Sequence, residues 1–126
     1  MAPTPANDLT HRVIGCALEV HYHLGPGLLE SIYEECLCRE LVRTGIAFTR
    51  QRPLPVVFKG EDIDCMLRLD LVVEDSLVVE LKSVARLHPV HEAQLLTYLR
   101  LSGIRLGLLI NFNEVPLSRG IRRRRL

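Results

Sequence analysis

The sequence predicts an α/β domain in which a mixed β-sheet is flanked by helices, in the order helix, helix, strands, helix, strand. Two observations support this fold class: apolar residues recur at helical spacing up to about residue 43, and a period of two replaces that spacing from Ile46. With 126 residues, 48% of them hydrophobic and 25% charged, the chain has the composition of an ordinary globular domain. We therefore expect a single domain over residues 1–126, with residues 1–7 disordered.

The first part of the chain predicts two helices. Apolar residues three or four positions apart indicate a helix over residues 8–24. The Gly-Pro-Gly segment 25–27 then breaks the chain. A second helix is expected over residues 28–43, and it ends at Gly45 as the predicted C-cap.

The remaining elements follow from alternation and turn residues. Strands are expected at residues 46–51, 54–63, 65–74 and 77–84, with turns at 59–62 and 74–76. Residues 91–102 return to a helical pattern, and residues 105–112 predict a buried strand. The basic segment 119–126 predicts either an edge strand or a loose tail.

The bulk properties limit the classes of function. A formal net charge of +1 creates no global field that attracts nucleic acid or a membrane, so a charged partner must be met by a local patch. No apolar run approaches the roughly 18 residues that span a bilayer, and the N-terminal segment lacks the basic and apolar regions of a signal peptide. The cysteines and histidines lack the spacing of a zinc or iron–sulfur site. We expect a cytoplasmic protein without a membrane partner.

The hairpin predicted around residues 74–76 carries an unusual charge pattern. A three-residue loop sets Asp70 opposite Glu80, and Arg68 opposite Lys82. Like charges then face each other twice, which destabilises a sheet. Either this face is solvated and the opposite charges pair diagonally, or a divalent cation such as Mg²⁺ binds the carboxylates while the basic side chains face an anionic substrate.

These residues also resemble a known family. Asp70 and the segment 80–82 (Glu-Leu-Lys) resemble the D...ExK core of the PD-(D/E)XK nuclease superfamily. Gln94 and Tyr98 resemble the QxxxY pattern of its RecB-type branch. Residues 27–33 resemble the signature of the small bacterial GxxExxY family, whose usual wording is also similar to "PVHEAQLLTYL" and "GLLINF".

The resemblance implies a restriction-endonuclease-like core and a metal-dependent nuclease that hydrolyses phosphodiester bonds of DNA, or less readily of RNA. The implied cofactor is Mg²⁺, for which Mn²⁺ can substitute. The implied site comprises the catalytic metal ligands Asp70, Glu80 and Glu30, the catalytic Lys82, and the substrate-binding residues Gln94, Tyr98, Tyr33 and Arg68. His91 is expected at the rim of this site.

Two other classes of function stay open. One is a catalytically silent nuclease-fold module that binds nucleic acid or a protein partner, and the other is an oligomeric scaffold with a solvated charged face. The arginine run 122–125 indicates either nucleic-acid contact or a solvated edge that discourages strand-to-strand aggregation. Because so small a domain has little room for sequence readout, a homodimer or a partner subunit would fit the nuclease or the module.

Overall fold

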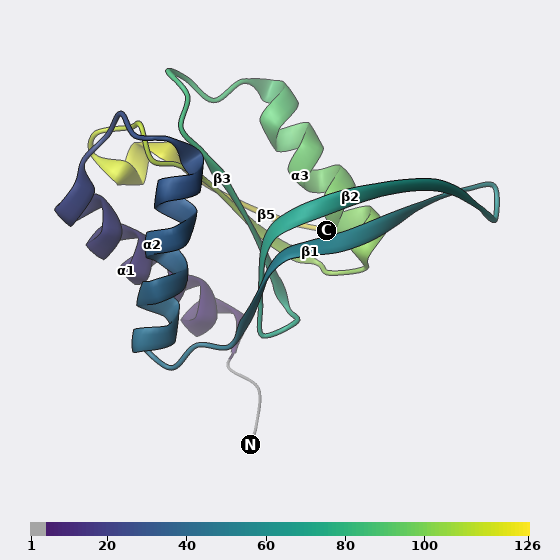
Figure 1. Ribbon diagram of the computed structural model, residues 1–126, viewed down its shortest axis with the longest axis horizontal. Helices are drawn as coiled ribbons and strands as arrows, with labels where there is room; N and C mark the ends of the chain where they lie inside the picture. The colour runs from purple at the N-terminus through teal and green to yellow at the C-terminus, as the bar shows by residue number, and fades with distance from the viewer. Residues whose placement is uncertain (1–4) are drawn as a thin grey trace.

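A five-stranded sheet separates two layers of helices in the computed structural model, which describes residues 5–126 (Figure 1). In chain order the elements are α1 Ala6–Leu24, α2 Glu30–Arg43, β1 Phe48–Phe58, β2 Glu61–Val73, β3 Leu77–Lys82, α3 Pro89–Ser102, β4 Leu106–Asn111, the short 3₁₀ helix η1 Leu117–Gly120, and β5 Ile121–Arg125. The α/β class and the order helix, helix, strands, helix, strand are confirmed, and β5 is an additional strand. No helix within the described residues is long and apolar enough to cross a bilayer.

The sheet is mixed, as predicted. Its strands lie in the order β1-β2-β3-β4-β5, and β3 and β4 are parallel whereas the other pairs are antiparallel. The crossover that a parallel pair requires contains α3. Most of the basic segment 119–126 forms β5, so this segment is an edge strand and not a loose tail.

The N-terminal boundaries differ from the prediction in two places. Helix α1 begins at Ala6, so Ala6 and Asn7 of the segment 1–7, expected to be disordered, are helical, while residues 1–4 lie outside the described part of the chain. Helix α2 begins at Glu30 and not at Leu28, because the main-chain N–H of Leu28 bonds the Tyr33 hydroxyl and keeps the loop extended.

The predicted strands 46–51 and 54–63 are largely one strand, β1, which ends at Phe58. Pro53 does not interrupt β1, because an edge strand tolerates a proline whose missing N–H faces away from the ladder. The turn lies at Lys59 and Gly60, both with positive φ, and β2 begins at Glu61. Together β1 and β2 form a long hairpin whose turn projects away from the helices, while its base packs against α3 (Figure 1).

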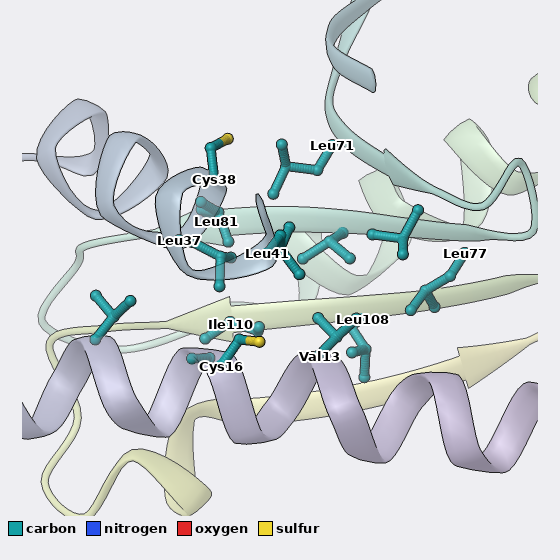
Figure 2. Close-up of a cluster of buried hydrophobic side chains, with 14 of the residues drawn as sticks. Val13, Cys16, Leu37, Cys38, Leu41, Leu71, Leu77, Leu81, Leu108 and Ile110 are labelled. Carbon is teal, nitrogen blue, oxygen red and sulfur yellow. The ribbon is translucent and has the colours of Figure 1, made fainter. Parts of the chain in front are cut away.

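Two hydrophobic cores cover the two faces of the sheet. The larger core packs α1 and α2 on one face, and Figure 2 shows Val13, Cys16, Leu37, Leu41, Leu71, Leu81 and Leu108 meeting there. The smaller core packs α3 on the opposite face and consists of Leu69, Val72, Val78, Leu95, Leu99 and Leu109. Because side chains two apart on a strand share a face, Glu80 points to the same α3-facing side as Val78.

Helix α3 approaches β4 closely at a glycine. A Cβ atom added to Gly107 would lie 2.8 Å from Cδ1 of Leu95. The absence of a side chain therefore lets α3 pack directly on the strand next to β3, which brings its other side chains within range of the end of β3.

Candidate active site

Strands β2 and β3 stop pairing immediately before the two predicted carboxylates. Their register begins with Val73 opposite Leu77, as the predicted three-residue loop requires, and its last pair is Leu71 with Val79. Asp70 and Glu80 are the next residues on the two strands. The strands diverge from this point.

The two carboxylates replace the missing rungs of the ladder. The main-chain N–H of Asp70 donates a 2.8 Å hydrogen bond to Oε2 of Glu80. In return, the main-chain N–H of Leu81 donates a 2.9 Å hydrogen bond to Oδ2 of Asp70. Each acidic side chain is therefore held against the main chain of the neighbouring strand, and the two carboxylates converge at the point of divergence.

Burial raises the pKa of both carboxyl groups. Glu80 is only 5% exposed, and burial together with the charge of Asp70 raises its pKa to about 8. Burial also raises the pKa of Asp70, and the charge of Glu34 adds to this effect while the hydrogen bond from Leu81 opposes it. A cation beside the pair would favour the charged forms of both groups.

Lys82 and Glu30 complete the charged cluster at this strand end. The charge of Lys82 lowers the pKa of Asp70 and of Glu80, whereas the charge of Glu30 raises that of Asp70. Among the described residues, however, no ion pair joins Lys82 or Arg68 to either carboxylate. The diagonal ion pairs expected of a solvated face are therefore not formed.

Hydrogen bonds beyond β3 hold the chain next to the cluster. The Ser83 hydroxyl donates to the carbonyl of Leu28, in the loop before α2, at 2.5 Å. Asn111 is fully buried, and its side chain accepts from the N–H of Val84 at 3.0 Å and donates to its carbonyl at 2.9 Å. Sequence reasoning missed this role of Asn111, although a polar residue inside a buried strand was an available signal.

A second group that sequence reasoning missed links α2 to Asp70 through β1. Glu34 is 8% exposed and accepts hydrogen bonds of 2.7 Å from Arg50 Nε and from Gln51 Nε2. The same Gln51 nitrogen lies 3.5 Å from Oδ1 of Asp70. Gln51 has a φ of 52°, rare for a residue in a strand, and period-two alternation contains no signal for it.

Helix α3 brings Tyr98 and His91 toward the cluster. Burial raises the pKa of Tyr98, and the charges of Glu80 and Asp70 add to this effect. His91 Nδ1 accepts a 3.0 Å hydrogen bond from the main-chain N–H of His88, so the neutral ring carries its proton on Nε2. Burial and the charge of Lys82 lower the pKa of His91. Both residues therefore lie within electrostatic range of the charged cluster.

Two predicted substrate-binding residues lie outside this cluster. Gln94 is exposed on α3, and its side chain makes no hydrogen bond within residues 5–126. Arg68 is exposed on β2, where its strand partner is Pro53, and its guanidinium donates a 3.4 Å bond to the carbonyl of Gln51. The predicted placement of Arg68 opposite Lys82 is wrong because β2 and β3 have already diverged.

Tyr33, also predicted to bind substrate, is fully buried. Its ring stacks on Phe112 with centroids 4.5 Å apart and an interplanar angle of 10°. Its hydroxyl donates to the carbonyl of Gly25 and accepts from the N–H of Leu28 at 3.2 Å. Tyr33 thus shapes the loop that precedes Glu30 and presents no surface to a substrate.

The donor set of the cluster fits a hard divalent cation. Within residues 5–126, no three His, Cys, Asp or Glu side chains are grouped to hold a metal ion, so Glu30 is not placed as a third ligand. Mg²⁺, however, is often bound through one or two carboxylates, with water and phosphate oxygens completing its shell. In the same part of the chain, Oδ1 of Asp70 has only the 3.5 Å contact with Gln51 and Oε1 of Glu80 accepts no hydrogen bond, so each carboxylate keeps one oxygen for a cation.

The mixed sheet between helices, with two carboxylates and a lysine where its strands diverge, is a restriction-endonuclease-like arrangement. A family model described as the PD-(D/E)XK nuclease superfamily matches residues 7–124. The chain belongs to this superfamily, which confirms the resemblance at that level and indicates a nuclease, a hydrolase that binds nucleic acid. Searches of curated proteins and of solved structures found no significant match.

Proposed function

We propose that this protein is a metal-dependent nuclease that hydrolyses phosphodiester bonds of DNA, or less readily of RNA, with Mg²⁺ as cofactor and Mn²⁺ as a substitute. The observation that carries this proposal is the convergence of Asp70, Glu80 and Lys82 where β2 and β3 diverge. We also propose, on the motifs at residues 27–33 and 94–98, that the chain is a member of the GxxExxY family and the RecB-type branch.

In this proposal Asp70 and Glu80 hold the cation, and Glu30, which is not grouped with them as a third ligand among the described residues, positions the attacking water. When bound, the cation supplies Lewis-acid polarisation of the phosphodiester and a water of lowered pKa. Lys82, whose charge acts on both carboxylates, stabilises the negative charge that develops on the phosphate.

The remaining side chains position the substrate. Tyr98 contacts a sugar, phosphate or base from α3, and Gln94 donates hydrogen bonds from the exposed side of the same helix. His91 presents its Nε2–H at the rim, since its other ring nitrogen is occupied by the N–H of His88. Arg68 contacts backbone phosphate from β2, outside the charged cluster.

A cleavage assay tests the proposal directly. Labelled single-stranded, duplex and branched DNA, and RNA, are incubated with the protein in Mg²⁺, Mn²⁺ or EDTA. We expect metal-dependent cutting that falls by at least about a hundredfold in Lys82→Ala and in Glu80→Gln, the loss typical when a group that stabilises transition-state charge is removed. The matched control is Lys59→Ala, which removes an exposed lysine at the hairpin tip and is expected to cut like the wild type.

Other outcomes would contradict the proposal. Cutting that persists in EDTA would show that the reaction needs no divalent cation. Cutting that persists in both variants would show that the cluster of Asp70, Glu80 and Lys82 does not perform it. Tight binding without cutting would instead identify a silent nucleic-acid-binding module. If the protein neither binds nor cuts nucleic acid, the oligomeric scaffold is the class of function that remains.

A further inference from the structure

The arginine strand β5 has a defined geometric relation to the candidate active site. Leu109 on β4 is the Cα partner of Glu80 on β3 and also of Arg122 on β5. Arg122 therefore lies in the same row of the sheet as Glu80, about 10 Å away at the usual spacing of about 4.8 Å per strand. Residues paired across a ladder share a face, so both side chains lie on the face covered by α3.

Ion pairs with α3 confirm which arginines face that side. Arg122 Nε lies 3.4 Å from Oε1 of Glu92, and Arg124 Nη2 lies 2.8 Å from its Oε2. Two guanidinium groups thus share a single carboxylate, which leaves an excess of positive charge. Their side chains remain 40% and 36% exposed.

The two arginines are also held in position by main-chain carbonyls. Arg122 Nη1 donates to the carbonyl of Arg119 at 2.8 Å and to that of Ile121 at 3.1 Å. Arg124 Nη1 donates to the carbonyl of Arg123 at 2.9 Å. Because each guanidinium has five N–H donors, several remain for a ligand after these contacts.

The other two arginines of the run point to the opposite face. Arg123 and Arg125 alternate with Arg122 and Arg124 along β5, and Arg123 Nη2 donates a 2.9 Å hydrogen bond to Oδ1 of Asn7 in α1. The run is therefore not one uniform basic patch. It consists of two pairs on different sides of the sheet, and only one pair shares the face of Glu80.

The first turn of α3 lies between the cluster and β5. In this turn, His91 is close enough to Lys82 for the charge of Lys82 to lower the pKa of His91. The next residue, Glu92, forms ion pairs with Arg122 and Arg124. A chain of phosphates that passes from Lys82 over this turn would reach the two arginines. The distance of about 10 Å between Glu80 and Arg122 corresponds to about three base-pair steps along the axis of a duplex.

We propose that Arg122 and Arg124 form a phosphate-contact strip that binds the nucleic-acid backbone beside the cleavage site, and that Arg123 and Arg125 take no part. The substrate class in this inference rests on the proposed function. Arginine forks match phosphate oxygens in geometry and charge. Such contacts fix the position of the strand without reading its sequence.

The salt dependence of binding tests the strip. Labelled duplex and single-stranded DNA are titrated in EDTA, where cutting is prevented, over a series of salt concentrations. For Arg122→Gln/Arg124→Gln we expect the slope of log K against log salt on duplex to become shallower by about 1.8, because each phosphate that is no longer neutralised changes this slope by about 0.9. The matched control Arg123→Gln/Arg125→Gln removes the same charge from the same strand and should leave the slope unchanged.

A variant expected to raise the affinity for DNA controls for loss of folding. Glu92→Gln removes the carboxylate that the two arginines share, so it should tighten binding at low salt, which misfolding cannot do. Equal effects of the two arginine pairs, or an unchanged slope in both, would overturn the strip. The latter result would leave β5 as a charged edge that resists strand addition.

The same measurements separate this inference from the proposed function. If the wild type binds DNA with a slope that depends on Arg122 and Arg124 but never cuts it in Mg²⁺ or Mn²⁺, the strip stands and the nuclease proposal fails. If the wild type cuts DNA and the slope of log K against log salt does not depend on Arg122 and Arg124, only the phosphate-contact strip is overturned. A wild type that neither binds nucleic acid in EDTA nor cuts it in Mg²⁺ or Mn²⁺ overturns both.

Discussion

The side-chain nitrogen of Gln51 lies 3.5 Å from Oδ1 of Asp70 on the neighbouring strand, and it donates a 2.7 Å hydrogen bond to Glu34 at the same time. Gln51 thereby connects a buried carboxylate of α2 to the carboxylate proposed to hold the cation. Groups of this kind orient ligands without touching the metal themselves.

Removal of this amide should weaken the site. We expect Gln51→Ala to lower Mn²⁺ affinity or cleavage by about 10-fold to 100-fold, the usual cost of losing a supporting hydrogen bond at a metal site. Calorimetric titration with Mn²⁺ and the cleavage assay measure the effect. The control is Arg52→Ala, at the residue that follows Gln51. It removes an exposed ion pair with Asp75 and should change neither quantity. Equal losses in both variants would contradict the role of Gln51.

Glu80 should make the stability of the metal-free protein depend on pH. Its pKa is about 8 in the folded chain and near 4.5 when unfolded, so between these values the folded state holds a proton that the unfolded state has released. The free energy of unfolding must then fall as the pH rises through this window. In EDTA, denaturant titrations of the wild type should show this fall, and Glu80→Gln should show a smaller one. Parallel pH profiles for the two proteins would contradict the raised pKa.

Tyr33→Phe distinguishes a structural tyrosine from a substrate-binding one. The variant keeps the stack on Phe112 but leaves the N–H of Leu28 and the carbonyl of Gly25 without the hydroxyl. We expect the free energy of unfolding to drop by about 1–3 kcal/mol, while the KM for nucleic acid stays unchanged. A raised KM with unchanged stability would restore Tyr33 to the substrate-binding residues.

Two glycines should respond to alanine in opposite directions. A Cβ on Gly120 would lie 2.5 Å from the carbonyl oxygen of Asn111, so Gly120→Ala must displace the main chain at the end of β4. We expect it to lower the free energy of unfolding by about 1–3 kcal/mol. Gly15, exposed within α1, has no atom within 4 Å of an added Cβ, and Gly15→Ala should raise the same quantity by about 0.5–1 kcal/mol. Denaturant titration measures both.

The juxtaposition of Asp70 and Glu80 could be predicted because it depends only on local rules. A three-residue loop sets the register of the hairpin, and alternation sets the face. The position of Arg68 could not be predicted in this way. Regular pairing ends at Leu71 and Val79, before Arg68 is reached, since the carboxylates themselves take over the ladder hydrogen bonds. A pattern of charges contains no sign of that substitution.

Helical periodicity had a similar limit in α2. It predicts that Glu30, Tyr33 and Glu34 share a side of the helix, but not which of them meets the core. Stacking on Phe112, a residue distant in the chain, buries Tyr33, and contacts with Arg50 and Gln51 from β1 bury Glu34. Glu30 remains at the exposed N-terminal end of the helix, where its charge acts on Asp70.

The reciprocal bonds of Asp70 and Glu80 also determine how an inactive form of this protein should be made. Each carboxylate accepts a hydrogen bond from the main chain of the other strand, so alanine at either position removes an inter-strand hydrogen bond as well as an acidic group. We expect the Leu81 amide to exchange its hydrogen with deuterium much faster in Asp70→Ala than in Asp70→Asn, whose amide oxygen can still accept that bond. Asp70→Asn and Glu80→Gln are therefore the replacements expected to abolish the proposed cleavage while the hydrogen bonds between β2 and β3 are kept.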